Sequence, residues 1–192
     1  MPIVPDSKDW TWVLERTCTE CGFAPDAVSF EAVPGLVRDS ATRISAALER
    51  PDATVRPDDS TWSTLEYAAH VRDVCRIFEH RLDITRTGSA RPGPVIGGYD
   101  SSVSLDDAGI PTFANWDQDI TAVAENYGSQ RPGAVAAELS AAAEKTAGAF
   151  ESVPDADRAR FSRRSNGSQF TVDSLARYFA HDLVHHVHDV RG

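Results

Sequence analysis

Basic residues, cysteines and long apolar runs are all scarce in this sequence. Its 19 Lys and Arg residues face 29 Asp and Glu residues, which leaves a formal net charge of −10. A chain this acidic is a poor match for a nucleic-acid backbone, so we expect no nucleic-acid partner. Three cysteines, an odd number, do not suggest a disulfide framework. No stretch approaches the roughly eighteen uninterrupted apolar residues of a membrane helix, so we expect no membrane partner.

The start of the chain also lacks a targeting pattern. Residues 1–6 contain no basic segment followed by an apolar run, so a secretory signal is not expected and the predicted location is the cytoplasm. The composition, 41% apolar and 25% charged, is typical of a globular protein. We therefore expect one domain over residues 1–192, with an N-terminal arm at residues 1–33 and a helical bundle at residues 34–190.

Four long segments carry apolar residues at helical spacing. They are residues 34–50, 63–85, 132–151 and 171–190. The second is the clearest, because Ser63-Thr-Leu-Glu66 forms a capping box in which the serine and glutamate side chains each satisfy a backbone amide of the first turn. Together they predict an all-α fold, a four-helix bundle with antiparallel pairs.

The connections between these helices differ in length. Residues 86–112 are rich in Gly, Pro and Ser, which predicts a long crossover between the second and third bundle helices. A short helix is expected to follow and to end near Tyr127. Just before it, residues 115–117 (Asn-Trp-Asp) either line a pocket or form an aromatic anchor at the helix start. Asn166-Gly167 predicts a tight turn and at most a short hairpin, not a core sheet.

The final helix concentrates potential metal ligands. Residues 181–190 contain four of the six histidines and two aspartates. Two pairs stand four residues apart, His181/His185 and Asp182/His186, and either pair can hold one ion from a single helix face. At about 100° per residue, Asp182 and His186 fall at the edge of the apolar stripe, whereas His181 and His185 fall roughly opposite its centre. This register favours Asp182/His186.

A third ligand has to come from another helix. His70 lies at the edge of the apolar stripe of residues 63–85, where a histidine is either a hydrogen-bonded core residue or a ligand. The histidine cluster favours the ligand. We therefore predict a metal site of His70, Asp182 and His186. Two imidazoles and one carboxylate suit zinc first, and also nickel, iron or manganese, with a coordination position left open.

The N-terminal arm contains two tryptophans, Trp10 and Trp12, and after them the motif Cys18-x-x-Cys21. A four-cysteine zinc site is impossible, because Cys75 is the only further cysteine. The motif is thus either a surface turn with reduced thiols, a redox-active pair, or half of a metal site.

At these residues the sequence resembles the DinB-like superfamily of metal-binding four-helix bundles, which includes the mycothiol-dependent maleylpyruvate isomerases. The resemblance covers roughly residues 34–190. Trp62-Ser63-x-x-Glu66-x-x-x-His70-Val71 resembles the family motif whose histidine is a ligand, and the doublet His185-His186 resembles the end of its last-helix motif. That alignment puts Asp182 and His186 on the ligand positions. The family usually has His or Glu where this chain has Asp182, so His181/His185 stays open as the alternative.

The resemblance implies a metal-dependent transferase or isomerase that uses a low-molecular-weight thiol, such as mycothiol or bacillithiol, on a small electrophilic substrate. A basic residue would be expected to help hold an acidic thiol cofactor. The alternatives are a metallohydrolase that uses metal-bound water, and a non-catalytic metal-stabilised bundle. The partner expected in each case is a small molecule, with a homodimer left open, and no catalytic or cofactor-binding residue is assigned.

Overall fold

The computed structural model describes residues 10–89 and 92–192. Four long helices form a bundle: α1 (Val33–Ala47), α2 (Thr64–Thr87), α4 (Pro132–Glu151) and α5 (Val172–Asp189). Their bounds lie within a few residues of the predicted ones, so the predicted four-helix bundle is confirmed. None of the helices in the described ranges is long and apolar enough to cross a membrane.

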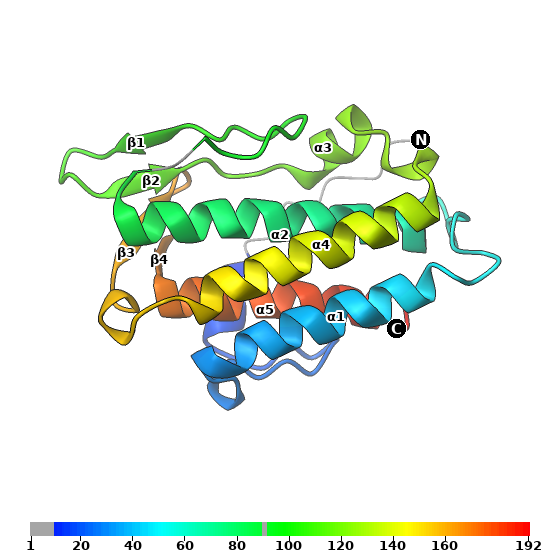
Figure 1. Ribbon diagram of the computed structural model, residues 1–192, viewed down its shortest axis with the longest axis horizontal. Helices are drawn as coiled ribbons and strands as arrows, with labels where there is room; N and C mark the ends of the chain where they lie inside the picture. The colour runs from blue at the N-terminus through cyan, green and yellow to red at the C-terminus, as the bar shows by residue number, and fades with distance from the viewer. Residues whose placement is uncertain (1–9, 90–91) are drawn as a thin grey trace.

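Each bundle helix packs mainly on two others. Helices α1 and α2 both pack against α4 and α5 and make few contacts with each other. Figure 1 shows that α1 and α5 run toward one end of the bundle and that α2 and α4 run in the opposite direction. The start of α2 therefore lies beside the end of α5. The predicted antiparallel pairing holds for α2 with α5 and for α1 with α4, whereas the other two neighbouring pairs are parallel.

Aromatic rings fill the centre of the bundle. Phe179 of α5 stacks on Phe78 of α2 at 4.9 Å between ring centroids and on Phe150 of α4 at 5.6 Å. All three side chains are at most 1% exposed. Burial of side chains of this size contributes about 2–3 kcal/mol each, so this stack is a major part of what holds the helices that carry the site together.

Local capping sets where the two site-bearing helices begin. Ser63 Oγ accepts from the Glu66 backbone N–H at 3.3 Å, and the Glu66 carboxylate accepts from the Ser63 N–H at 2.9 Å, which is the predicted capping box. Thr171 and Ser174 form a second such box at the start of α5. These contacts satisfy backbone amides that the helices leave unpaired.

The prediction of a wholly α-helical fold needs an extension, because a small sheet is also present. Its strands are β1 (Val103–Leu105), β2 (Pro111–Phe113), β3 (Phe161–Arg164) and β4 (Gln169–Thr171), in the order β1-β2-β3-β4. The outer pairs are antiparallel and the central pair, β2 with β3, is parallel. The sheet lies at the end of the bundle where α2 ends (Figure 1).

The β3–β4 hairpin turns at Asn166-Gly167, as predicted, with Gly167 at a φ of 95°. Strands β1 and β2 were not predicted. They lie in the segment between α2 and α4, together with α3 (Gln118–Ala124) and a short 3₁₀ helix at Tyr127–Ser129. The described part of the N-terminal arm, from Trp10 on, contains three more 3₁₀ turns, η1 (Trp10–Leu14), Pro25–Ala27 and Phe30–Ala32, and η1 packs on α5.

Candidate metal centre

His70, Asp182 and His186 meet between the start of α2 and the end of α5. Their ligand atoms all lie within 4.8 Å of one another. Asp182 Oδ1 is 3.1 Å from His186 Nε2 and 3.8 Å from His70 Nε2. Neighbouring ligands of a tetrahedral zinc ion stand about 3.3 Å apart, given zinc–ligand bonds of about 2.0–2.1 Å. Small side-chain shifts would close these three atoms around one ion.

Protonation differs among the three side chains. Burial lowers the pKa of His70, which leaves a neutral imidazole with a free lone pair. Burial alone would raise the pKa of Asp182, but the neighbouring His186 and His70 hold that pKa well below its ordinary value. Burial opposes protonation of His186 too, yet Asp182 and Asp189 raise its pKa to about 9. In the metal-free protein His186 is therefore an imidazolium between two carboxylates.

Neighbouring groups hold both imidazoles in place. His186 Nδ1 donates to Asp189 Oδ2 at 2.9 Å, which directs Nε2 toward Asp182. A carboxylate behind a histidine in this way is the usual support of a metal-binding imidazole. His70 lies between two tryptophans: Trp116 stacks on it at 5.2 Å with an angle of 11°, and Trp62 packs at 5.3 Å.

His70 also has an unsatisfied side. Its Nδ1 is buried and has no hydrogen-bond partner among the residues that the structure describes. A buried core histidine is normally hydrogen-bonded through its polar atoms. His70 does not meet that expectation at Nδ1. Its Nε2 lies 3.8 Å from Asp182 Oδ1, which is longer than a hydrogen bond and leaves room for an ion between the two side chains.

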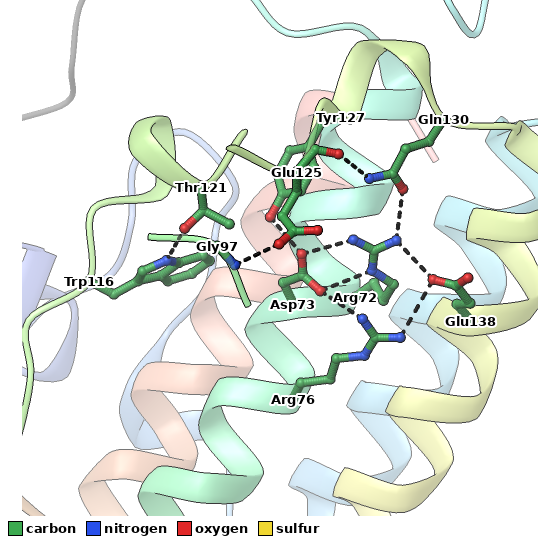
Figure 2. A network of polar contacts seen from close by, with 10 residues as sticks. All are labelled: Arg72, Asp73, Arg76, Gly97, Trp116, Thr121, Glu125, Tyr127, Gln130 and Glu138. Atoms are coloured by element: carbon green, nitrogen blue, oxygen red, sulfur yellow. Dashed lines mark hydrogen bonds and ion pairs between the residues drawn. The ribbon is translucent and has the colours of Figure 1, made fainter. Parts of the chain in front are cut away.

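A buried polar network fixes the segment that carries Trp116 (Figure 2). The Asp73 carboxylate, one turn along α2 from His70, accepts from Arg72 at 2.9 Å, Arg76 at 3.1 Å and the Tyr127 hydroxyl at 2.8 Å. Trp116 Nε1 in turn donates to Thr121 Oγ1 of α3 at 2.7 Å. The connection between α2 and α4 is thus tied to α2 beside the ligand. Residues 115–117 fit the aromatic-anchor prediction, since Asp117 caps α3.

The three side chains open into a pocket of about 350 Å³. Its described lining residues include four carboxylates, several aromatic rings and no Lys or Arg: Trp10, Glu20, Ser60, Trp62, Tyr67, His70, Gln118, Asp119, Tyr178, His181, Asp182, His185, His186 and Asp189. Burial raises the pKa of Tyr67 above its ordinary range, so its hydroxyl stays protonated. The basic residue expected for an acidic thiol cofactor has no counterpart in this lining.

The competing pair, His181 and His185, is not on an outer surface. Their exposed fractions are 4% and 9%, because the N-terminal arm covers that face of α5. A position opposite the apolar stripe therefore does not make His185 an outward-facing residue. Helical register located the face opposite the stripe correctly, but it could not show that another segment packs there.

The arm also contributes residues that the sequence argument left out of the site. Trp10 and Glu20 line the pocket, and Cys18 and Cys21 lie beside His181 and His185. Cys18 is 1% exposed, which excludes the simple surface turn for that residue. The sequence does contain a signal for this cluster, namely a C-x-x-C motif together with the pair His181-x-x-x-His185.

Comparison with known proteins agrees with this architecture. Residues 36–190 match the sequence profile of the DinB superfamily. The chain belongs to the DinB superfamily. A solved structure, that of YfiT from Bacillus subtilis, described as a probable metal-dependent hydrolase with an unusual four-helix bundle topology, superposes with a TM-score of 0.63. The two share 14% sequence identity, with 84% of each chain covered, a likeness that shows the fold. No curated protein matches the chain.

Proposed function

We propose that this DinB-superfamily protein is a metal-dependent hydrolase of a small neutral or cationic molecule, with His70, Asp182 and His186 as the metal ligands. The observation that carries the proposal is a three-ligand set that opens into a polar pocket, because catalytic sites keep a coordination position free. The donor set suits zinc first, and nickel, iron or manganese next. The description of YfiT as a probable metal-dependent hydrolase points the same way.

A divalent ion held there supplies a Lewis acid that lowers the pKa of a coordinated water molecule or thiol. The chain's own groups do the rest. Asp189 holds the His186 ring through Nδ1. Trp62 and Trp116 enclose His70 and keep water from its faces. Tyr67 offers a protonated hydroxyl at the pocket wall, and Glu20 is a carboxylate of the lining that can accept a proton.

The charge of the pocket supports the choice of substrate. Glu20, Asp119, Asp182 and Asp189 give the described lining a negative field, and one bound divalent ion offsets only part of it. Among the described lining residues there is no Arg or Lys that could hold an anionic substrate against this field. A neutral or cationic molecule in the cytoplasm is the substrate class that fits, in keeping with the acidic chain as a whole.

Thiol transfer, implied by the sequence motifs, is the second candidate. The motif around His70 on α2 supports thiol transfer, whereas the charge of the pocket restricts which thiols can bind. An acidic thiol of the bacillithiol type lacks a cationic partner among the described lining residues, whereas a thiol without carboxylates, of the mycothiol type, meets no such obstacle.

One assay separates the two candidates. Untagged protein is loaded with zinc and tested on matched ester and amide substrates that carry a positive, no, or a negative charge. The same preparation is tested on an electrophile with a neutral and an acidic thiol. We expect hydrolysis without added thiol, favouring neutral and cationic substrates and lost in Asp182→Ala. Turnover that strictly requires a thiol would replace hydrolysis by transfer. Metal-independent turnover would contradict both.

A further inference from the structure

The N-terminal arm and α5 bring together a second set of potential ligands. Cys18, Cys21, His181 and His185 each offer one ligand atom, and these four atoms lie within 4.8 Å of one another. Cys18 Sγ is 3.7 Å from His185 Nδ1. Neighbouring sulfur and nitrogen ligands of a tetrahedral zinc ion are about 3.5 Å apart, given bonds of about 2.3 and 2.0–2.1 Å. The cluster shares no residue with His70, Asp182 and His186.

The backbone between the two cysteines is shaped to turn both sulfurs toward α5. Gly22 N–H donates to Cys18 O at 2.9 Å, and Cys18 N–H donates to Phe23 O at 2.8 Å. Gly22 has a φ of 76°, a conformation that side chains with a Cβ rarely adopt. Such a turn holds both thiols on one side, as a metal-binding C-x-x-C requires.

The histidines supply the independent sign of a missing ligand. His181 Nε2 is buried and has no hydrogen-bond partner in residues 10–89 and 92–192. Its ring is enclosed by Phe23 at 5.5 Å, Trp10 at 5.8 Å and Trp12 at 6.5 Å, an apolar setting in which an unpaired polar atom is costly. His185 Nε2, on the far side of its ring, is 3.4 Å from Glu20 Oε2, the arrangement that supports a ligand bound through Nδ1.

We propose that Cys18, Cys21, His181 and His185 form a second metal site, a structural zinc centre that fastens the N-terminal arm to α5. Two thiolates and two imidazoles fill all four tetrahedral positions, so no position is open for substrate. Binding replaces the two thiol protons, which pass to solvent, and the resulting centre is electrically neutral. The site does not depend on the chemistry of the first one.

The location gives the second centre a task. The arm carries Trp10 and Glu20, which line the pocket of the first centre. A metal at Cys18 and Cys21 would fix the part of the arm that contains Glu20 and follows Trp10 against α5. It would thereby hold one wall of the pocket and leave the His70, Asp182 and His186 set to the substrate.

Cobalt distinguishes the two centres, because only a thiolate ligand produces an intense near-ultraviolet charge-transfer band. Untagged full-length protein is stripped of metal under reducing conditions and titrated with Co²⁺. We expect two equivalents per chain, of which one develops the band. His70→Ala should keep the band and lose the other equivalent. His181→Ala and Cys21→Ser should lose the band and keep the His70 equivalent. His188→Ala is the control and should keep both.

A second measurement needs no variant. Zinc-loaded wild type should protect two of its thiols from an alkylating reagent until a chelator is added, and mass spectrometry should then find Cys18 and Cys21 alkylated. A mass 2 Da lower than that of the reduced chain, unaffected by the chelator, would mean a disulfide and overturn the proposal. Two cobalt equivalents without a thiolate band, or thiols that react equally with and without zinc, would overturn it as well.

Discussion

Two faces of the same helix carry the same ligand spacing and lead to different sites. On the face of α5 that meets α2, Asp182 and His186 join His70 and border an open pocket. On the next face, His181 and His185 join two cysteines under the N-terminal arm. A shift of one residue rotates a helix by about 100°, so each i, i+4 pair meets a different partner. The segment that packs on each face decides whether the ligand pair there keeps an open coordination position or has all positions filled.

Asp189 lies where these two faces meet. Its Oδ2 accepts from His186 Nδ1 at 2.9 Å, and its Oδ1 is 3.8 Å from His185 Nε2. One carboxylate therefore faces a histidine of each set. The comparison predicts that substitutions at the ligands separate the two faces cleanly, and that substitution of Asp189 affects both.

Ligand removal at the pocket face should have the largest effect. Asp182→Ala or His186→Ala should lower metal affinity at the first centre by more than about 100-fold, beyond the loss typical of a supporting residue, and abolish turnover. Titration with zinc against a chelator, with His188→Ala as the control, measures this. His181→Ala should leave the first centre's affinity nearly unchanged. If His181→Ala removed that metal while Asp182→Ala kept it, the assignment of the two faces would be reversed.

Ligand removal at the arm face should act on stability instead. In zinc at 100 times its dissociation constant, a bound ion stabilises the native state by about 2.7 kcal/mol, roughly 5–10 °C in Tm for a chain of this size. Cys18→Ser should lose that increment and keep only the part of the zinc response that comes from the first centre. Differential scanning calorimetry with and without zinc tests this, with Cys75→Ala, which removes a thiol outside the cluster, as the comparison. Equal zinc responses in the two variants would speak against an arm-face centre.

Much of this arrangement was readable in the sequence, and the reason is local. Helix limits, the capping box of α2 and the Asn166-Gly167 turn depend on neighbours within a few residues, so periodicity and capping patterns located them. His70 was found because it stands four residues after Glu66 of the capping box in a motif shared with the superfamily.

What escaped prediction depends on contacts between distant segments. Strand β2 pairs with β3 about fifty residues later, and strands of three residues are too short to show an alternating pattern. The burial of His181 and His185 depends on an arm more than 150 residues earlier in the chain. Register on α5 ranked the two pairs as rivals for one ion, because one helix alone cannot show that both of its faces are covered.

Substitution of Asp189 should have a smaller effect that spreads to both faces. Asp189→Asn removes the charge behind His186, so we expect metal affinity at the first centre to fall about 10- to 100-fold. The arm centre should weaken less, because the Asp189–His185 separation is 3.8 Å. Zinc and cobalt titrations measure the two effects. Asp173→Asn, which alters a carboxylate paired with Arg177 in the first turn of α5, is the matched control. An Asp189→Asn variant with wild-type affinity would remove Asp189 from the site.

The pH dependence of metal uptake is the finest test. Although burial opposes it, Asp182 and Asp189 raise the pKa of metal-free His186 to about 9, so below that pH one proton must leave His186 as the ion binds. Affinity at the first centre should rise about tenfold per pH unit from pH 7 to about 9 and then level off. By the same sign, the stabilisation that this imidazolium gives the metal-free protein is lost as the pH rises through about 9. Chelator competition in Cys18→Ser, which isolates the first centre, measures the slope. A plateau already at pH 7 would contradict the raised pKa.

The central claim is a metal centre formed by His70, Asp182 and His186. The most direct test compares the metal content of untagged His70→Ala with that of the untagged wild-type protein. Elemental analysis after purification in zinc-supplemented buffer should give two ions per wild-type chain and one per His70→Ala chain, with circular dichroism unchanged. Because His70 is the one ligand of the first centre that comes from outside α5, its loss opens that centre and leaves the arm centre intact. Equal metal content in the two proteins would contradict a centre formed by His70, Asp182 and His186.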